Sequence, residues 1–294
     1  MGYGSYSAAD WKKLKASRKL SGNQNVDEVF KNTSCNPKFN PLFIGTRECF
    51  DSQDHPNTTP IVVGLDVTGS MGYLAVEVAT GALNELITKL YSTCSVEDPA
   101  LMCAAYGDYH DESPLQVTQF ESDIRIAEQL LELYFENGGC CNVTPTLLWE
   151  FLARHTNIDA INKRGEKGFV FTIGDNAEIR KNEVASTISR AIGDNIPDAT
   201  RESILEEVSE KFNVFHIMIG GSVNDNPDIL IGRKINISKD TIKLIPEIII
   251  STIQLVKGMN TEDIINQWDD ISKPVIRTAL SQLNIADSGQ PVNL

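Results

Sequence analysis

The sequence is poor in features that would indicate a membrane or secreted protein. It has no uninterrupted run of about 18 apolar residues, the length that a helix needs to cross a bilayer, and its N-terminal segment lacks the apolar core of a secretory signal. The most apolar late stretch, residues 242–256, is interrupted by Lys243, Pro246 and Glu247. We therefore expect no membrane association and a cytoplasmic location, and we interpret residues 242–256 as a core helix.

Cysteine pairs at the spacing of a metal or redox site are also absent. None of the six cysteines forms a Cys-x-x-Cys pair; they are Cys35, Cys49, Cys94, Cys103, Cys140 and Cys141. The adjacent Cys140 and Cys141 have poor geometry for an ordinary disulfide or a two-thiolate metal site. We expect free thiols in a reducing compartment.

Basic residues are too few for a nucleic-acid-binding surface. The chain has 26 Lys and Arg against 40 Asp and Glu, which gives a net charge of −14, and a phosphate backbone would be repelled on average. The short basic run between Lys12 and Lys19 is interpreted as the solvated face of a helix. A phosphate-binding GxxxxGK[ST] loop is missing as well, which excludes nucleotide hydrolysis of that type.

Apolar segments alternate with helical patterns from residue 57 onward. We predict strands at 60–66, 101–106, 115–120, 168–173, 213–219 and 234–237. We predict helices at 73–91, 123–135, 145–155, 178–211 with a break near 193–197, 241–257 and 261–283. Near-continuous apolar strands between helices indicate an α/β fold, with a doubly wound, mostly parallel sheet and helices on both faces.

The ends of the chain have a different character from its middle. We expect residues 1–56 to form an N-terminal extension packed on the core, residues 57–258 to form the α/β domain, and residues 259–294 to form a C-terminal helix and tail. Trp11 and Trp268 are candidate anchors, and we expect the two ends to pack on one side of the sheet.

The segment 61–72, IVVGLDVTGSMG, carries the most informative pattern of the chain. Asp66 ends a predicted strand, and the hydroxyls of Thr68 and Ser70 follow at alternate positions. These three side chains can face one centre, and an all-oxygen donor set suits a hard cation such as Mg²⁺. The alternative is an ordinary turn and helix N-cap, in which the same side chains satisfy free backbone N–H groups.

Two further oxygen donors stand at strand or loop ends that precede helices. Thr144 follows a Gly-rich loop and directly precedes Pro145, and Asp175 follows the predicted strand 168–173. Capping is again the alternative for each. Because ligands of open α/β sheets bind beyond the carboxyl ends of the strands, the acids at several strand ends are informative together. Asp108 follows the strand 101–106 and either lies at the rim of such a site or simply ends its strand, which we favour.

In order and spacing, these segments resemble the metal-ion-dependent adhesion site (MIDAS) of von Willebrand factor type A (vWA) domains. The family's Asp-x-Ser/Thr-x-Ser is matched by Asp66, Thr68 and Ser70, its loop threonine by Thr144, and its strand-end aspartate by Asp175. The resemblance covers about residues 57–258 and is typical of intracellular microbial members. Gly174 and Asn176 replace the family's usual Thr and Gly beside Asp175.

The resemblance implies a cation site and a way of using it. It implies that Mg²⁺, or else Mn²⁺ or Ca²⁺, is held by Asp66, Thr68, Ser70, Thr144 and Asp175, with the aspartates acting partly through water. One coordination position would stay open for an Asp or Glu of a partner protein, and Asp108 is a candidate for the second shell. The family includes members that act beside AAA+ ATPases of the MoxR type, which makes such an ATPase a candidate partner.

The other function that we considered is catalytic. A metal-dependent hydrolase or phosphoryl-transfer enzyme could use the same acidic site. Of the four histidines, His110 alone is expected near that site, and His216 lies inside a predicted strand, where a core position is expected. No base is tied to the site by the sequence, so we expect a protein-binding module and not an enzyme.

Overall fold

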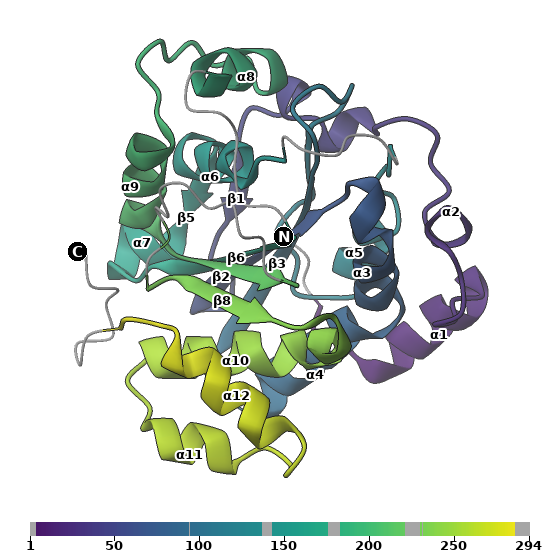
Figure 1. Cartoon of the computed structure of the whole chain (residues 1–294), viewed down its shortest axis with the longest axis vertical. Helices are drawn as coiled ribbons and strands as arrows, with labels where there is room; N and C mark the ends of the chain where they lie inside the picture. Colours follow the sequence, from purple (N-terminus) through teal and green to yellow (C-terminus); the bar gives the residue numbers. More distant parts are fainter. Residues whose placement is uncertain are drawn as a thin grey trace.

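The computed structural model describes residues 4–93, 95–136, 143–175, 183–220, 230 and 232–285. Its central sheet consists of β2 (Thr58–Asp66), β3 (Asp98–Tyr106), β4 (Leu115–Val117), β6 (Gly168–Gly174), β7 (Phe212–Ile219) and β8 (Lys234–Ile237). The strand order is β4-β3-β2-β6-β7-β8. Among these six strands only β4 runs antiparallel to its neighbour, and helices cover both faces (Figure 1). The predicted fold class, a doubly wound and mostly parallel α/β fold, is confirmed.

The central strands are buried on both faces, and this explains their continuous apolar sequence. Side chains of a strand alternate between faces, so Ile61, Val63 and Leu65 of β2 belong to one hydrophobic core and Val62 belongs to the other. Phe169 and Val170 of β6 divide between the two cores in the same way.

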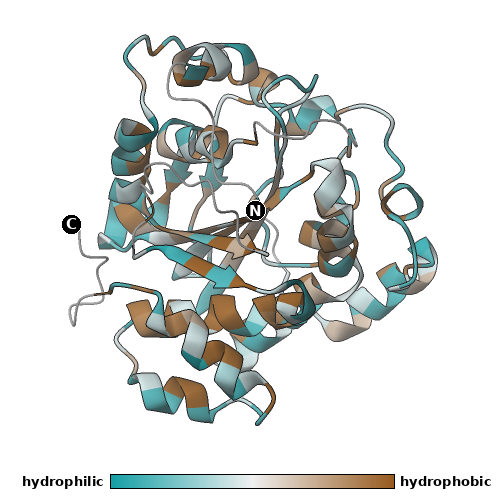
Figure 2. Ribbon diagram, viewed as in Figure 1, coloured by the Kyte–Doolittle hydropathy of each residue, from teal (hydrophilic) through white to brown (hydrophobic). Residues whose placement is uncertain are grey.

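The first core lies between the sheet and a large helical layer. The helices of this layer are α1 (Ala8–Arg18), α2 (Val26–Val29), α3 (Gly72–Glu77), the π-helical η4 (Val78–Ala82), α4 (Leu83–Ser92), α5 (Arg125–Leu130), α10 (Ile245–Val256), α11 (Thr261–Asn266) and α12 (Ser272–Ser281). Figure 2 shows α10 largely in the hydrophobic colour and α1 mostly in the hydrophilic colours. The predicted core helix at 242–256 is confirmed: α10 is preceded by the 3₁₀ turn η6 (Lys239–Leu244).

The second core lies under α6 (Pro145–Arg154), α8 (Val184–Ala191) and α9 (Arg201–Lys211). Beside it, β1 (Arg47–Cys49) pairs in parallel with β5 (Thr156–Ile158), and α7 (Asp159–Arg164) follows. The sequence did not predict this small sheet or α7. Both elements are short, and the pairing of β1 joins residues that lie more than a hundred positions apart.

Three predicted helices differ from those observed. The helix predicted at 73–91 contains the π turn η4, in which Thr80 Oγ1 donates to the carbonyl of Val76 over 2.8 Å. The helix predicted at 123–135 is only Arg125–Leu130. The helix predicted at 261–283 is two helices, because Asp269 accepts from the backbone N–H of Ser272 at the start of α12 and Pro274 is tolerated only in a first turn.

Both ends of the described chain contact the first core. Trp11 of α1 is buried in it, and the partly buried Trp268 packs against it while donating from Nε1 to Ser251 Oγ over 2.8 Å. The N-terminal part also reaches the other face, because Cys49 of β1 belongs to the second core. Among the described residues, no helix is both long and apolar enough to cross a membrane.

Candidate metal centre

The predicted site residues lie near the topological switch point of the sheet, where the order in which strands are added reverses. The chain leaves β2 to build β3 and β4 on one side and later returns to build β6, β7 and β8 on the other. Leu65 of β2 pairs with Ile173 of β6, so Asp66 and Asp175 follow from adjacent strand ends. This is the position at which open α/β sheets bind ligands.

The Asp66 carboxylate organises the loop that follows β2. Its Oδ1 accepts the backbone N–H of Thr68 over 2.9 Å and the Thr68 hydroxyl over 2.7 Å. Thr68 makes no capping hydrogen bond to the short 3₁₀ helix η3 (Gly69–Met71) that it precedes. The turn alternative therefore holds for Asp66, whereas the N-cap alternative does not hold for Thr68.

The hydroxyl of Ser70 joins this loop to the end of β6. Ser70 Oγ donates to Asp175 Oδ2 over 3.1 Å and lies 3.4 Å from Thr68 Oγ1. Four of the five predicted ligands are thus connected in one chain of contacts. Whether Asp175 also caps a helix concerns Asn176 and the residues after it, which lie outside the described residues together with the Gly-rich loop at 137–142.

Thr144 reaches the same end of the sheet through α6. Val143 forms a bridge with Asp108 just beyond β3, and a Cβ at Gly64 would lie 2.5 Å from Leu148 of α6. Gly64 therefore lets α6 lie close against β2 two residues before Asp66. Thr144 lies one turn before Leu148 on the same helix face, toward the end of the strand.

At this end of the sheet, two of the buried oxygen atoms find no hydrogen-bond partner among the described residues. They are Asp66 Oδ2 and Thr144 Oγ1, and both residues are 0% exposed. Thr144 stands at the N-cap position of α6 without making a side-chain cap, so its capping alternative does not hold. Buried polar atoms are rarely left unpaired because this costs about 1–3 kcal/mol. The residues present therefore fit an oxygen-ligated cation.

The electrostatics of the site favour a cation as well. Burial, with a smaller contribution from repulsion by the carboxylates of Asp175 and Asp111, raises the pKa of Asp66 to about 7 against the effect of its hydrogen bonds from Thr68. Burial and the nearby Asp175 and Asp66 also raise the pKa of Tyr73. Negative charges thus accumulate around a carboxylate that is shielded from water, and a divalent cation would relieve that repulsion.

Gly174 explains one departure from the vWA pattern. A Cβ at this position would lie 2.9 Å from both Cβ and Oδ2 of Asp66 and 3.1 Å from the hydroxyl of Tyr106. That hydroxyl is itself fixed by donating to the carbonyl of Ile173 over 2.9 Å. Glycine therefore leaves the room in which the Asp66 side chain stands.

Asp108 and Asp111 form a turn just beyond the end of β3. Asp108 Oδ1 accepts the backbone N–H of His110, and the backbone N–H of Asp108 donates to Asp111 Oδ2, each over 2.9 Å. Burial and the neighbouring Glu136 raise the pKa of Asp111 to about 6. Asp111 was not among the residues predicted from the sequence, although it stands three residues after Asp108 in the same acidic loop.

The position of His216 tests the prediction that this histidine belongs to the core. His216 is a fully buried residue of β7, and its Nδ1 lies 2.8 Å from Thr172 Oγ1 of β6. The prediction of a core histidine is confirmed. Free thiols are likewise confirmed for Cys35, Cys49 and Cys103, whereas Cys94, Cys140 and Cys141 lie outside the described residues.

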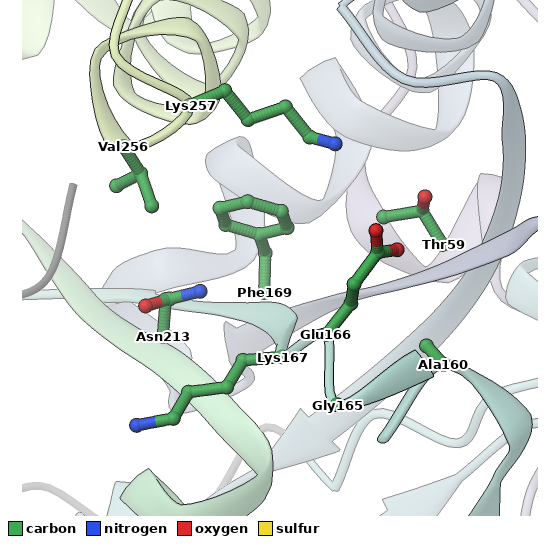
Figure 3. A pocket seen from close by; sticks show the side chains of 9 residues that line it. All are labelled: Thr59, Ala160, Gly165, Glu166, Lys167, Phe169, Asn213, Val256 and Lys257. Atoms are coloured by element: carbon green, nitrogen blue, oxygen red, sulfur yellow. The ribbon is translucent and has the colours of Figure 1, made fainter. Parts of the chain in front are cut away.

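A pocket of about 260 Å³ lies at the other end of the sheet. Thr59 from the start of β2, Phe169 from β6, Asn213 from β7 and Lys257 after α10 contribute to its wall (Figure 3). Figure 3 shows Lys167 pointing away from the side on which Glu166 and Lys257 extend. Because these residues belong to the amino ends of the strands, the pocket is separate from the predicted cation site.

Comparison with known proteins finds only weak similarity in backbone structure. Neither a protein-family model nor a curated protein matches the chain. Among solved structures it is similar to the pilus adhesin SpaC from Lactobacillus rhamnosus GG, with 12% identity and a TM-score of 0.45 over 70% of this chain and 31% of the adhesin. It is also similar to BatB from Bacteroides thetaiotaomicron, with 14% identity and a TM-score of 0.34 over 55% of this chain and 67% of BatB.

A third solved structure is proximal thread matrix protein 1 from the mussel byssus, with 12% identity and a TM-score of 0.44 over 70% of this chain and 49% of that protein. The matrix protein has also been solved with zinc in a MIDAS motif. This chain therefore spans about a third of the adhesin and about half of the matrix protein. These likenesses concern the fold alone.

Proposed function

We propose that the chain binds a divalent cation beyond β2 and β6 and uses it to capture an acidic side chain of a partner protein. The observation that carries the proposal is the pair of buried oxygens without a described hydrogen-bond partner, Asp66 Oδ2 and Thr144 Oγ1. They lie at the same end of the sheet as the connected hydroxyls of Thr68 and Ser70. All the donors are oxygens, which suits Mg²⁺ first and Mn²⁺ or Ca²⁺ next.

The hydrogen bonds of the site support hydroxyl ligation. Thr68 donates its hydroxyl hydrogen to Asp66, and Ser70 donates its own to Asp175. A hydroxyl that gives its hydrogen to a carboxylate keeps oxygen lone pairs for a cation. Direct ligation by hydroxyls would leave a bound ion with much of its positive charge, which a partner's carboxylate could neutralise.

The burial of the residues differs between the two sides of the site. Asp66, Thr68 and Thr144 are buried, whereas Ser70 is exposed and Asp175 is intermediate. The site thus has a closed floor and one side that faces solvent, where a partner's Asp or Glu can approach. The AAA+ ATPase of the MoxR type that the sequence resemblance suggests is the first partner to test.

Calorimetric titration with Mg²⁺ tests the cation site. We expect Asp66→Asn and Ser70→Ala to weaken binding at least about tenfold, and Asp270→Asn, whose side chain is 96% exposed between α11 and α12, to leave it unchanged. Equal affinity in all of these proteins would reject the site.

Capture assays with and without EDTA test the use of the cation. A partner that binds the wild type in Mg²⁺, and neither in EDTA nor to Ser70→Ala, would support the proposal. Turnover of phosphoester substrates that is lost in Asp175→Ala would instead support the metal-dependent hydrolase.

A further inference from the structure

A second group of potential ligands lies at the opposite end of α6 from Thr144. It consists of Glu150 in α6, His155 directly after this helix, and Asp194 in the segment after α8. One ligand atom from each side chain lies within 4.8 Å of the other two. We call these three residues the α6 triad. No short sequence motif connects these residues, because 44 positions separate Glu150 from Asp194.

Glu150 is the unusual member of the α6 triad. It is 0% exposed, and neither of its carboxylate oxygens accepts a hydrogen bond from any residue that the structure describes. Arg154 Nε lies 3.8 Å from Glu150 Oε1, but the same guanidinium donates from Nη2 to Glu207 over 2.7 Å. Burial and the adjacent Asp194 carboxylate raise the pKa of Glu150 to about 9. A buried carboxylate in this setting requires a proton or a cation.

His155 is oriented toward the same point. Its Nδ1 lies 2.9 Å from the carbonyl oxygen of Gly45, which can only accept, so Nδ1 carries a hydrogen. In the neutral ring, Nε2 then presents a lone pair to Asp194 Oδ2 at 2.8 Å. Two lone pairs at this distance repel each other, so a positive charge is required between them.

We propose that Glu150, His155 and Asp194 bind a divalent transition-metal ion, with Zn²⁺ as the best match. One imidazole nitrogen and two carboxylate oxygens suit Zn²⁺ and its neighbours, whereas Mg²⁺ and Ca²⁺ prefer oxygen ligands alone. Ligating histidines commonly donate their second N–H to a carbonyl or carboxylate, as His155 does to Gly45. With Zn–N and Zn–O bonds of about 2.0–2.2 Å, ligand atoms that lie within 4.8 Å of one another would need to move toward a common centre by less than roughly 1 Å.

The ion would connect three separate parts of the chain. Gly45 belongs to the segment before β1, Glu150 and His155 belong to α6 and its end, and Asp194 belongs to the segment between α8 and α9. The side chains of His155 and Asp194 are 19% and 26% exposed, so an ion could enter from solvent and keep a water molecule as a further ligand. Binding to the folded state alone would raise the thermal stability of the protein.

The alternative is that protons fill the same role. Glu150 would share a proton with Asp194, and His155 would be protonated on both nitrogens. Burial alone would raise the pKa of Asp194, but its hydrogen bonds with Glu150 and His155 outweigh burial and lower it. The proton arrangement therefore satisfies the triad without any metal, and the experiment must distinguish the two.

Metal titration of the full chain carrying Asp66→Asn and Ser70→Ala provides the test, because that background removes the site of the proposed function. Zn²⁺ and Co²⁺ are added against a chromophoric chelator. We expect one equivalent to bind, and we expect Glu150→Gln or His155→Gln to weaken this binding about 10–100-fold. The matched control is Glu207→Gln, which changes the other carboxylate beside Arg154 and leaves affinity unchanged.

Thermal unfolding and the Co²⁺ spectrum complete the test. We expect saturating Zn²⁺ to raise Tm by at least about 3 °C in the background protein and not in His155→Gln. If His155→Gln does not fold, Asp194→Asn replaces it, since this side chain is partly exposed. Equal Zn²⁺ affinity with and without the triad, no saturable binding, or a thiolate charge-transfer band from Co²⁺ would overturn the inference.

Discussion

Ser70 and Asp175 are 105 positions apart in the sequence, yet the hydroxyl of Ser70 donates to Asp175 Oδ2 over 3.1 Å. The hydrogen bond joins the loop after β2 to the end of β6, and it directs the hydroxyl hydrogen toward the protein. The lone pairs of Ser70 thus remain available on the side where Thr68 Oγ1 lies, 3.4 Å away.

Thr144→Val should separate metal binding from stability. The substitution keeps the side-chain shape and removes a hydroxyl that is fully buried without a hydrogen-bond partner. In EDTA we expect the free energy of unfolding to rise by about 1 kcal/mol, and in calorimetry we expect Mg²⁺ affinity to fall at least about tenfold. Thr144→Ser keeps the hydroxyl and should retain the affinity. A valine variant that binds Mg²⁺ as the wild type does would show that Thr144 is not a ligand.

Gly174→Ala should disturb the site through its neighbour. The added Cβ would lie 2.9 Å from Asp66 Cβ and Oδ2, so the carboxylate has to move. We expect weaker Mg²⁺ binding with little change in secondary structure, measured by calorimetry and circular dichroism. The matched control is Gly81→Ala, where a Cβ meets nothing within 4 Å. Unchanged affinity in Gly174→Ala would mean that the site tolerates a displaced Asp66.

Lys89→Met should destabilise the contact between α4 and α10. Lys89 Nζ lies 2.6 Å from Glu247 Oε1, and the Glu247 side chain is only 7% exposed. Removing the lysine leaves a buried carboxylate without its cation, so urea unfolding should show a loss of roughly 3 kcal/mol. Adding Glu247→Leu should recover most of it. Lys13→Met, which breaks the exposed pair with Asp10, should change nothing measurable. Equal effects of the two lysine substitutions would contradict this account.

The buried thiols should resist alkylation in the native protein. Burial raises the pKa of Cys49 and of Cys103 to about 12, above the ordinary value for a thiol, so the reactive thiolate is nearly absent at pH 8. Peptide mass spectrometry after iodoacetamide treatment should find both unmodified in buffer and modified in urea. Rapid labelling of either residue under native conditions would show that its part of the core opens.

The sheet could be predicted because its signal is local. Each central strand reads as a continuous apolar run, and the order of strands and helices along the chain limits the topology to a few arrangements. A parallel sheet brings the carboxyl ends of neighbouring strands together, so the proximity of Asp66 and Asp175 could be predicted once β2 and β6 were recognised. Thr144 could be placed from the resemblance, but its missing cap became visible only in three dimensions.

Other features of the fold could not be predicted because they depend on contacts between residues that are distant in the sequence. The pairing of β1 with β5 joins Arg47 to Thr156, and the α6 triad needs Asp194 to meet a helix formed more than thirty residues earlier. A local hydrogen bond determines where α12 begins. Asp269 starts α12 by accepting the N–H of Ser272, and this divides a stretch whose apolar periodicity alone suggested one helix.

The helix α6 carries a candidate ligand at each end, with Thr144 before its first residue and His155 after its last. Ten residues of α-helix span about 15 Å and slide as a unit far more readily than they stretch. A displacement of α6 along its axis would therefore change the positions of Thr144 and His155 together. If both ends hold ions, any change that occupancy of one site makes in the affinity of the other is matched by the same factor in the reverse direction, and the helix would make two separate binding events a single thermodynamic unit.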